Sequence, residues 1–286
     1  MNRRPLASTT VREALDSAII ALSAAGCETP RLDAEVLLAT ALGVDRGVLI
    51  AHPRRELTGE QARWFMDAAR RRREREPVAY ILGSKGFRRL DLRVDRRVLI
   101  PRPETEHLVE AALALPPGAR VVDVGTGSGA IALAVKDERP DLVVFATDVS
   151  ADALEVARAN ALRLALDVSF VLGDLTAGLE VDAVVSNPPY VERHADLMPE
   201  IARYEPPLAL FGDGDGLAVI RALIRDVRAP FLALEHGEGQ ADAIEELARA
   251  AGFAEIERIR DLAGIERVLV ARREGDARFL RGAEET

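Results

Sequence analysis

The stretch Asn187-Pro188-Pro189-Tyr190 directly follows an apolar run over 181–186. Two consecutive prolines end a strand and hold the backbone extended, because proline lacks an N–H group and fixes its own φ. The resulting rim presents the side-chain oxygen of Asn187, the carbonyls of Asn187 and Pro188, and the ring of Tyr190. A planar NH2 group suits this rim, since two oxygens can each accept one hydrogen while the ring lies against its face. The same four residues are also compatible with a plain proline turn.

Polar residues also follow three earlier segments that are expected to be strands. The first carries the turn Asp123-Val124-Gly125-Thr126-Gly127-Ser128-Gly129, whose glycines let a ligand approach the main chain. Its Gly-x-Gly-x-Gly spacing departs from the Gly-x-Gly-x-x-Gly of nicotinamide dinucleotide sites. Asp148 ends the second strand, where a carboxylate can accept both ribose hydroxyls, and Asp174 after the third is placed to meet an adenine amino group. Together these strand ends predict a nucleoside site.

The charge of the glycine turn indicates which nucleoside ligand fits. The turn offers acids and no Lys or Arg, which is wrong for a pyrophosphate. Asp123 can instead lie near the ammonium group of a cationic ligand. These features favour S-adenosylmethionine as cofactor, with S-adenosylhomocysteine as product, and a methyl acceptor held by Asn187.

The segments that would carry these residues alternate between strand and helix. Such alternation predicts an α/β fold: a Rossmann-like, mostly parallel sheet covered by helices, closed by an antiparallel strand. Ligands bind such sheets at the carboxyl ends of the strands, near the switch in strand order. Strands are expected over 121–124, 142–147, 169–172, 181–186 and 231–234, helices over 129–135, 151–166, 217–227 and 241–251, and an antiparallel pair over 256–259 and 268–271.

The N-terminal residues predict a small helical bundle. Helices are expected from 11 to 22, from Pro30 to Leu42, and from Thr58 onwards, the last ending in an arginine-rich run over 70–76. That run is compatible with a solvated helix face or with a contact for an acidic partner. Alternation over 93–95 and 97–100 predicts a β-hairpin. Glu104 and Glu106 then fall in the first turn of a helix, where acids suit the helix dipole whether or not they bind a ligand.

Composition bounds the class of protein. The chain has 286 residues, an apolar fraction of 48% and a net charge of −9, which argues against direct nucleic-acid binding. One cysteine excludes an internal disulfide, and four scattered histidines suggest no metal site. No apolar run reaches the length of a membrane span, and no signal peptide follows Met1, so a cytoplasmic protein is expected.

Taken together, these motifs resemble class I S-adenosylmethionine-dependent methyltransferases that modify nitrogen. More narrowly, the chain resembles the release factor glutamine methyltransferases, also known as the HemK/PrmC family. The likeness extends over nearly the whole chain and includes the segments 76–83, 100–106, 204–210 and 264–267. One departure is Leu175, because an aromatic residue often follows the adenine-side Asp in relatives.

The resemblance implies methyl transfer to the side-chain amide nitrogen of the glutamine in the Gly-Gly-Gln motif of bacterial peptide-chain release factors, the expected protein partners. It implies a recognition domain over 1–80, a β-hairpin linker over 81–103 and a methyltransferase domain over 104–286. Asn187, Pro188 and Tyr190 would be catalytic, and Pro189 and Glu205 would join them in binding the substrate. The expected cofactor-binding residues are Asp123, Gly125, Thr126, Gly127, Ser128, Gly129, Asp148, Asp174, Leu175 and Asn187.

Three other functions stay open at this point. A glutamine methyltransferase for a ribosomal protein would share the rim and the fold and differ only in its acceptor. A DNA adenine-amino methyltransferase would need a basic cleft and a target-recognition insert, and neither is evident in this acidic chain. A non-catalytic adaptor would have lost cofactor binding, whereas Gly125, Gly127, Asp148 and Asn187 are all present.

Overall fold

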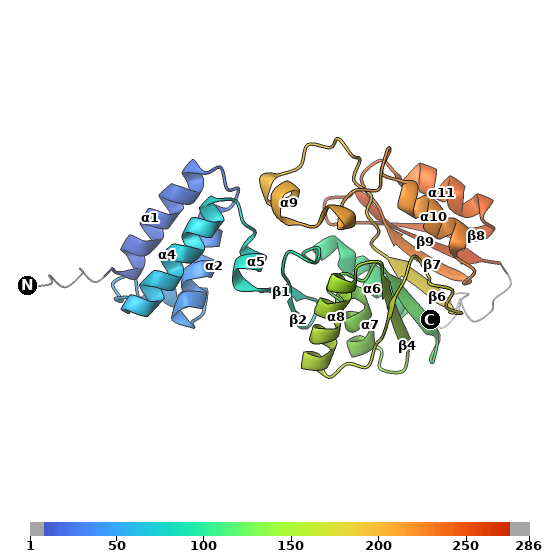
Figure 1. The fold of residues 1–286 in the computed structure, drawn as a ribbon, viewed down its shortest axis with the longest axis horizontal. Coiled ribbons are helices and arrows are strands. Elements are labelled where there is room, and N and C mark those ends of the chain that lie inside the picture. Colours follow the sequence, from blue (N-terminus) through green and yellow to red (C-terminus); the bar gives the residue numbers. More distant parts are fainter. Residues whose placement is uncertain (1–8, 275–286) are drawn as a thin grey trace, which may run out of the picture. The chain divides into compact units, whose positions relative to one another are not determined.

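The computed structural model describes residues 9–274, which divide into two compact units. One unit comprises residues 9–83 together with Met198–Tyr204, and the other comprises Ser84–Leu197 together with residues 205–274. Figure 1 shows the helical composition of the first and the central sheet of the second. No helix in residues 9–274 is long and apolar enough to cross a bilayer.

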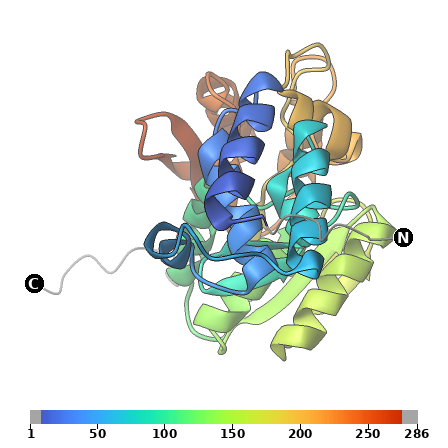
Figure 2. The same cartoon turned by 90° about the vertical axis from the view of Figure 1, so that its left-hand side faces the viewer.

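The first unit is a helical bundle, in which α1, α2 and α4 pack against one another (Figure 2). The helix starts after Thr10 and Thr58 and the end of α2 at Leu42 agree with the sequence prediction: Thr10 and Thr58 each form a capping box, and Gly43 follows α2 with a φ of 62°. The short helices α3, α5 and α9, each of six residues or fewer, were not predicted from the sequence. The helices are α1 (Val11–Ala24), α2 (Pro30–Leu42), α3 (Arg46–Ala51), α4 (Gly59–Arg73), α5 (Val78–Leu82) and α9 (Pro199–Tyr204).

The arginine-rich end of α4 is only partly a solvated face. Arg70 is exposed, but Arg72 is buried and pairs with Asp33 at 2.7 Å and with Glu200 at 2.8 Å. Arg75 contributes a second contact to Glu200 at 2.5 Å. The interpretation of the whole run as solvated is therefore wrong for Arg72, whose charge is matched inside the bundle by two carboxylates.

The β-hairpin lies earlier in the chain than expected. Strands β1 (Ser84–Phe87) and β2 (Leu90–Arg93) pair antiparallel. The residues predicted as its second strand, 97–100, are irregular, and the Val98 N–H closes a turn by donating to the Asp95 carbonyl at 3.1 Å. Val98 and Ile100 are buried, so their alternation reflects burial of an irregular segment. The true first strand contains Gly86 and lacks an apolar alternation that could have identified it.

In the second unit, the described residues form one seven-stranded sheet of order β5-β4-β3-β6-β7-β9-β8. The pairs among the first five strands are parallel, and β9 pairs antiparallel with both β7 and β8. The strand order changes direction between β3 and β6, the position at which such sheets bind ligands. The strands are β3 (Arg120–Val124), β4 (Val143–Asp148), β5 (Ser169–Leu172), β6 (Ala183–Ser186), β7 (Phe231–Glu235), β8 (Phe253–Arg260) and β9 (Glu266–Arg273).

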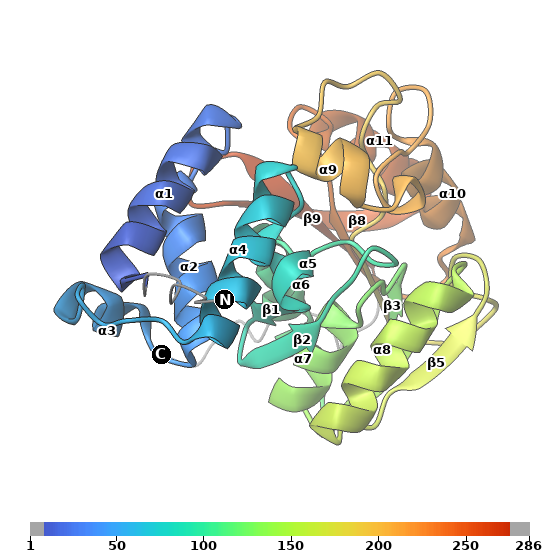
Figure 3. The same ribbon diagram turned by 60° about the vertical axis from the view of Figure 1, so that its left-hand side comes forward.

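Helices cover both faces of this sheet and form two apolar cores. On one face α6 and α7 pack on strand residues that include Val121 and Val144, and on the other α10 and α11 pack on Val122 and Val184. Figure 3 shows α8 beside β5, and the two elements are in contact. The helical elements are η1 (Pro103–Thr105), α6 (Glu106–Leu113), α7 (Ala130–Glu138), α8 (Ala151–Leu164), η2 (Pro207–Ala209), α10 (Ala218–Asp226) and α11 (Ala241–Ala250).

Candidate active site

The glycine turn after β3 is held open by backbone conformation. Gly125 and Gly127 have φ values of 71° and 55°, which side-chain-bearing residues rarely adopt. A Cβ atom added at either position would meet no atom within 4 Å, so both glycines border open space. The N–H groups of Gly125 and Thr126 donate to the Thr147 carbonyl at 2.9 and 3.0 Å, which fixes the turn against the end of β4.

Asp123 lies beneath this turn and is almost fully buried. Its Oδ2 accepts the hydroxyl of Thr126 at 2.6 Å and the N–H of Ala132 at 3.2 Å, which links the turn to α7. Its Oδ1 is buried without a hydrogen-bond partner in the described residues. Burial raises the pKa of Asp123 to about 7. An unpartnered buried acceptor of this kind is suited to a cation brought to the turn.

Two further acids lie at the ends of the neighbouring strands. The half-buried Asp148 accepts the N–H of Gly127 at 2.9 Å through Oδ2 and the N–H of Ser150 at 2.8 Å through Oδ1. Asp174, after β5, is exposed. Leu175 follows it with a φ of 49°, and its carbonyl accepts the Thr147 hydroxyl at 2.7 Å.

The proline rim lies directly beside the glycine turn. Val124 and Ser186 are register partners at the ends of β3 and β6, and the Ser186 hydroxyl donates to the Val124 carbonyl at 2.7 Å. Asn187 is half-buried, and its Nδ2 donates to the hydroxyl of Thr105 at 3.1 Å. The hydroxyl of Tyr190 donates to Glu235 at 3.0 Å. Burial is the main cause that raises the pKa of Tyr190 above its ordinary value, and the Glu235 carboxylate raises it further.

One cavity of about 530 Å³ joins the two features. Of the residues predicted to form the site, seven line it: Gly125, Gly127, Asp148, Asp174, Leu175, Asn187 and Pro189. Within residues 9–274, the others lie around it without lining it: Asp123, Thr126, Ser128, Gly129, Pro188, Tyr190 and Glu205. The cavity is also lined by residues that sequence reasoning did not select, among them Val98, Leu99, Thr147 and Phe211.

Glu205 is engaged with the protein itself. It is buried, and its carboxylate accepts Arg102 at 2.6 Å and the N–H of Ile100 at 3.3 Å. These contacts anchor the chain between the hairpin and η1. Its role in substrate binding stays a prediction.

Sequence reasoning missed Thr105 and Glu235, which are both buried behind the rim. Glu235 ends β7, directly after the apolar residues 231–234, so an acid at the end of a buried strand was the available signal. Thr105 gave no comparable signal, because its partners lie far away in the sequence.

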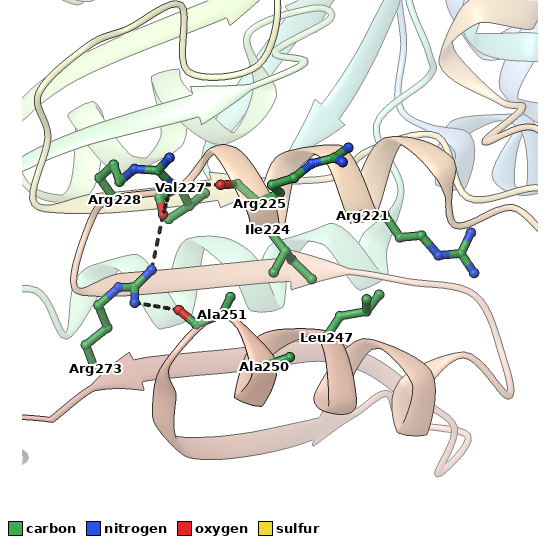
Figure 4. Close-up of a pocket in the computed structure, with 9 residues that line it drawn as sticks. All are labelled: Arg221, Ile224, Arg225, Val227, Arg228, Leu247, Ala250, Ala251 and Arg273. Atoms are coloured by element: carbon green, nitrogen blue, oxygen red, sulfur yellow. Dashed lines mark hydrogen bonds between the residues drawn. The ribbon is translucent and has the colours of Figure 1, made fainter.

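A second cavity, of about 510 Å³, lies near the start of β7 and the end of β9 (Figure 4). Two of the four arginines that line it donate to helix ends, and a third, Arg221, pairs with Asp215. Arg273 donates to the carbonyls of Val227 at 3.1 Å and Ala251 at 2.6 Å, and Arg228 donates to the carbonyl of Arg225 at 2.7 Å. These contacts satisfy carbonyls at the C-termini of α10 and α11, so the cavity has a structural explanation.

Known proteins resemble this chain in both of its units. Residues 13–83 match the PrmC N-terminal domain, and residues 104–205 match the methyltransferase small domain. A release factor glutamine methyltransferase of Koribacter versatilis (strain Ellin345) is 41% identical over 278 residues, which cover 92% of this chain and 99% of that protein. One from Moorella thermoacetica (strain ATCC 39073 / JCM 9320) is 43% identical over 279 residues, with 92% and 99% covered. The chain belongs to the release factor glutamine methyltransferases.

Membership of this family confirms the resemblance drawn from the sequence and makes the chain a methyltransferase that uses S-adenosylmethionine. The seven-stranded sheet confirms the predicted Rossmann-like fold class. A solved structure of the hMettl16 catalytic domain shares the fold with a TM-score of 0.53, at 16% identity over 65% of this chain and 76% of that one.

Proposed function

We propose that this chain transfers a methyl group from S-adenosylmethionine to the side-chain amide nitrogen of the glutamine in the Gly-Gly-Gln motif of peptide-chain release factors. The observation that carries the proposal is that Gly125, Asp148 and Asn187 all line the same cavity. A cofactor at the glycine turn and an amide at the proline rim would therefore share one space. The relatives named above are enzymes of this activity.

The residues at the cavity fit the cofactor. Asp148 can accept ribose hydroxyls in addition to its two backbone donors, because each carboxylate oxygen has more than one lone-pair direction. The exposed Asp174 can accept from the adenine amino group. Asp123 lies beneath the turn without lining the cavity, and its carboxylate, when ionised, would attract the ammonium group from there. Leu175 would supply an apolar surface where an aromatic ring often stands in relatives.

The protein's main task is to orient and desolvate a weak nucleophile, since the lone pair of an amide nitrogen is delocalised. When bound, S-adenosylmethionine supplies an electrophilic methyl group and is left as S-adenosylhomocysteine. The Asn187 Oδ1 and the Pro188 carbonyl would accept the two amide hydrogens, and Tyr190 would flank the amide plane. Accepting both hydrogens favours the positive charge that develops on nitrogen. After transfer the nitrogen releases one proton to solvent, and because an N-protonated amide is a strong acid, no catalytic base is assigned.

The remaining assignments follow from the same proposal. Residues 1–80 would recognise the release factor, 81–103 would link the two modules, and 104–286 would carry methyl transfer. Pro189 lines the cavity and Glu205 anchors the chain beside η1, so both belong to the proposed substrate side. We expect a protein substrate in the cytoplasm and no direct contact with nucleic acid.

The test is incubation of the purified chain with S-adenosylmethionine and release factor, followed by mass mapping of peptides. We expect one additional methyl group, confined to the glutamine of the Gly-Gly-Gln motif. Asn187→Ala should remove most turnover and change the Kd for S-adenosylmethionine by less than about twofold, because the loss falls on the acceptor. A methyl group on a ribosomal protein and none on the release factor would overturn the proposal.

A further inference from the structure

A chain of hydrogen bonds runs from the proposed acceptor site into the core. The Nδ2 of Asn187 donates to the Thr105 hydroxyl at 3.1 Å, and that hydroxyl donates to Oε2 of Glu235 at 2.7 Å. The hydroxyl of Tyr190 donates to the other oxygen, Oε1, at 3.0 Å. The four residues come from the end of β6, from η1 and from the end of β7. The carboxylate of Glu235 thus binds the Tyr190 hydroxyl directly and the Asn187 amide through Thr105.

The chemistry of these groups fixes the direction of every bond. In its ionised form Glu235 only accepts, and both hydroxyls donate to it. Because a hydroxyl has one hydrogen, the oxygen of Thr105 can meet Asn187 only as an acceptor. The NH2 end of the Asn187 amide must therefore face Thr105. Its Oδ1 is directed elsewhere and accepts no hydrogen bond from residues 9–274.

Burying the carboxylate of Glu235 costs free energy, and packing alone would not require a carboxylate at this position. Glu235 is 1% exposed and Thr105 is 3% exposed. No ion pair to Glu235 occurs within the described residues. Burial raises the pKa of Glu235, the hydroxyls of Thr105 and Tyr190 lower it, and of the charged groups Glu104 raises it and Arg267 lowers it. A neutral amide of the same shape would cost less to bury, but it would offer only one accepting end to two hydroxyls.

We propose that Glu235 is a positioning residue for methyl transfer: through Thr105 it holds the Asn187 amide with its carbonyl oxygen free for the substrate, and directly it holds Tyr190. The inference rests on the proposed function, since the free oxygen is the one assigned to grip the glutamine amide. Without the carboxylate, the Thr105 hydroxyl is free to donate to Asn187, and the amide can turn its NH2 towards the substrate. The NH2 group of Asn187 would then face the NH2 group of the substrate glutamine, and neither could accept a hydrogen bond from the other.

The first test measures turnover in Thr105→Val, Thr105→Ser and Glu235→Gln at saturating S-adenosylmethionine. We expect Thr105→Val and Glu235→Gln to lower kcat at least about tenfold, as expected for losing an oriented hydrogen bond. Thr105→Ser keeps the hydroxyl and should stay within about threefold of the parent. The losses of the two damaging variants should not multiply in the double variant, because they break one chain of bonds.

Thr176→Val is the matched control for stability. Its hydroxyl also donates to a carboxylate, that of Asp226, at 2.6 Å, and Thr176 is buried within the same unit. It should lose stability comparably and keep its kcat. If Thr105→Val keeps kcat within about twofold of the parent, or if Thr176→Val loses as much, the positioning role is overturned.

A second test does not depend on activity. The side-chain amide hydrogens of Asn187, assigned by NMR through their loss in Asn187→Asp, should exchange with solvent about tenfold faster in Thr105→Val and Glu235→Gln than in the parent. Unchanged exchange refutes the network even if the parent methylates release factors. Faster exchange in a protein that methylates no release factor supports the network and refutes the proposed function instead.

Discussion

Replacing Asp148 by Ala tests the assignment of the cofactor to the glycine turn. In the free protein this carboxylate accepts the N–H groups of Gly127 at 2.9 Å and Ser150 at 2.8 Å. If it also accepts ribose hydroxyls, the substitution removes a hydrogen bond to a charged group, worth about 1.5–3 kcal/mol. The Kd for S-adenosylmethionine should then rise by about 10- to 150-fold, while kcat at saturating cofactor falls much less.

The assay is titration calorimetry with S-adenosylhomocysteine and with its 2′-deoxy analogue. The parent should bind the deoxy analogue more weakly, whereas Asp148→Ala should bind the two ligands almost equally, because its partner for the hydroxyl is gone. This comparison separates a direct contact from damage to the turn, which would weaken both ligands in parallel.

Asp152→Ala is the matched control, since Asp152 is an exposed acid in the first turn of α8 and does not line the cavity. It removes the same charge and should leave the Kd within about twofold of the parent. A parent that binds the deoxy analogue as tightly as S-adenosylhomocysteine would refute the ribose assignment, whatever the effect of Asp148→Ala.

Three further predictions concern stability. Burial raises the pKa of Asp123 to about 7 from an ordinary 3.8, so ionisation of this carboxyl group favours the unfolded chain. The stability that the protonated group contributes is fully present below about pH 4. It is lost, by up to about 4 kcal/mol, as the pH rises to 7. Urea unfolding of Asp123→Asn should therefore lose less stability over this range than the parent, and equal losses would contradict the buried acid. Arg273→Ala should cost about 2 kcal/mol in urea unfolding, because the carbonyls of Ala229 and Ala251 lose their donor and that of Val227 keeps only Arg228. An unchanged midpoint would show that water replaces the guanidinium. Arg72→Met should cost about 3–5 kcal/mol by leaving Asp33 buried without its counter-charge and Glu200 with Arg75 alone, and a loss below about 1 kcal/mol would show that the bundle opens to solvate them.

The sequence predicted the elements whose pattern is local. Each parallel strand carried an apolar run followed by a glycine, an acid or a proline, and β5 was predicted with both bounds correct. Helix α2 was correct at both ends, because Pro30 and Gly43 are local start and stop signals. These patterns were sufficient to bring the glycine turn, Asp148 and Asn187 to one edge of a sheet.

The predictions that were wrong concerned features that depend on tertiary contacts. The segment 97–100 alternates because it places Val98 and Ile100 in the core, and its backbone is irregular. The burial of Arg72 depends on Asp33 and Glu200, which are distant in the sequence, so the charge run alone indicated a solvated face. Likewise, Thr105 and Glu235 are 130 residues apart, and neither is recognisable as a partner before the fold is known.

The parallel register explains why these distant residues meet. Val124 pairs with Ser186, and Ser186 pairs with Leu234, so the residues that follow each of the three lie side by side at one edge of the sheet. Strand β3 leads into the glycine turn, β6 leads into Asn187, and β7 ends with Glu235. A slip of β7 by one residue would put an apolar side chain where the carboxylate stands and turn Glu235 to the other face of the sheet. The direction of the Asn187 amide thus depends on strand pairing as well as on its own neighbours, and substitutions that loosen β7 should lower kcat before they lower cofactor affinity.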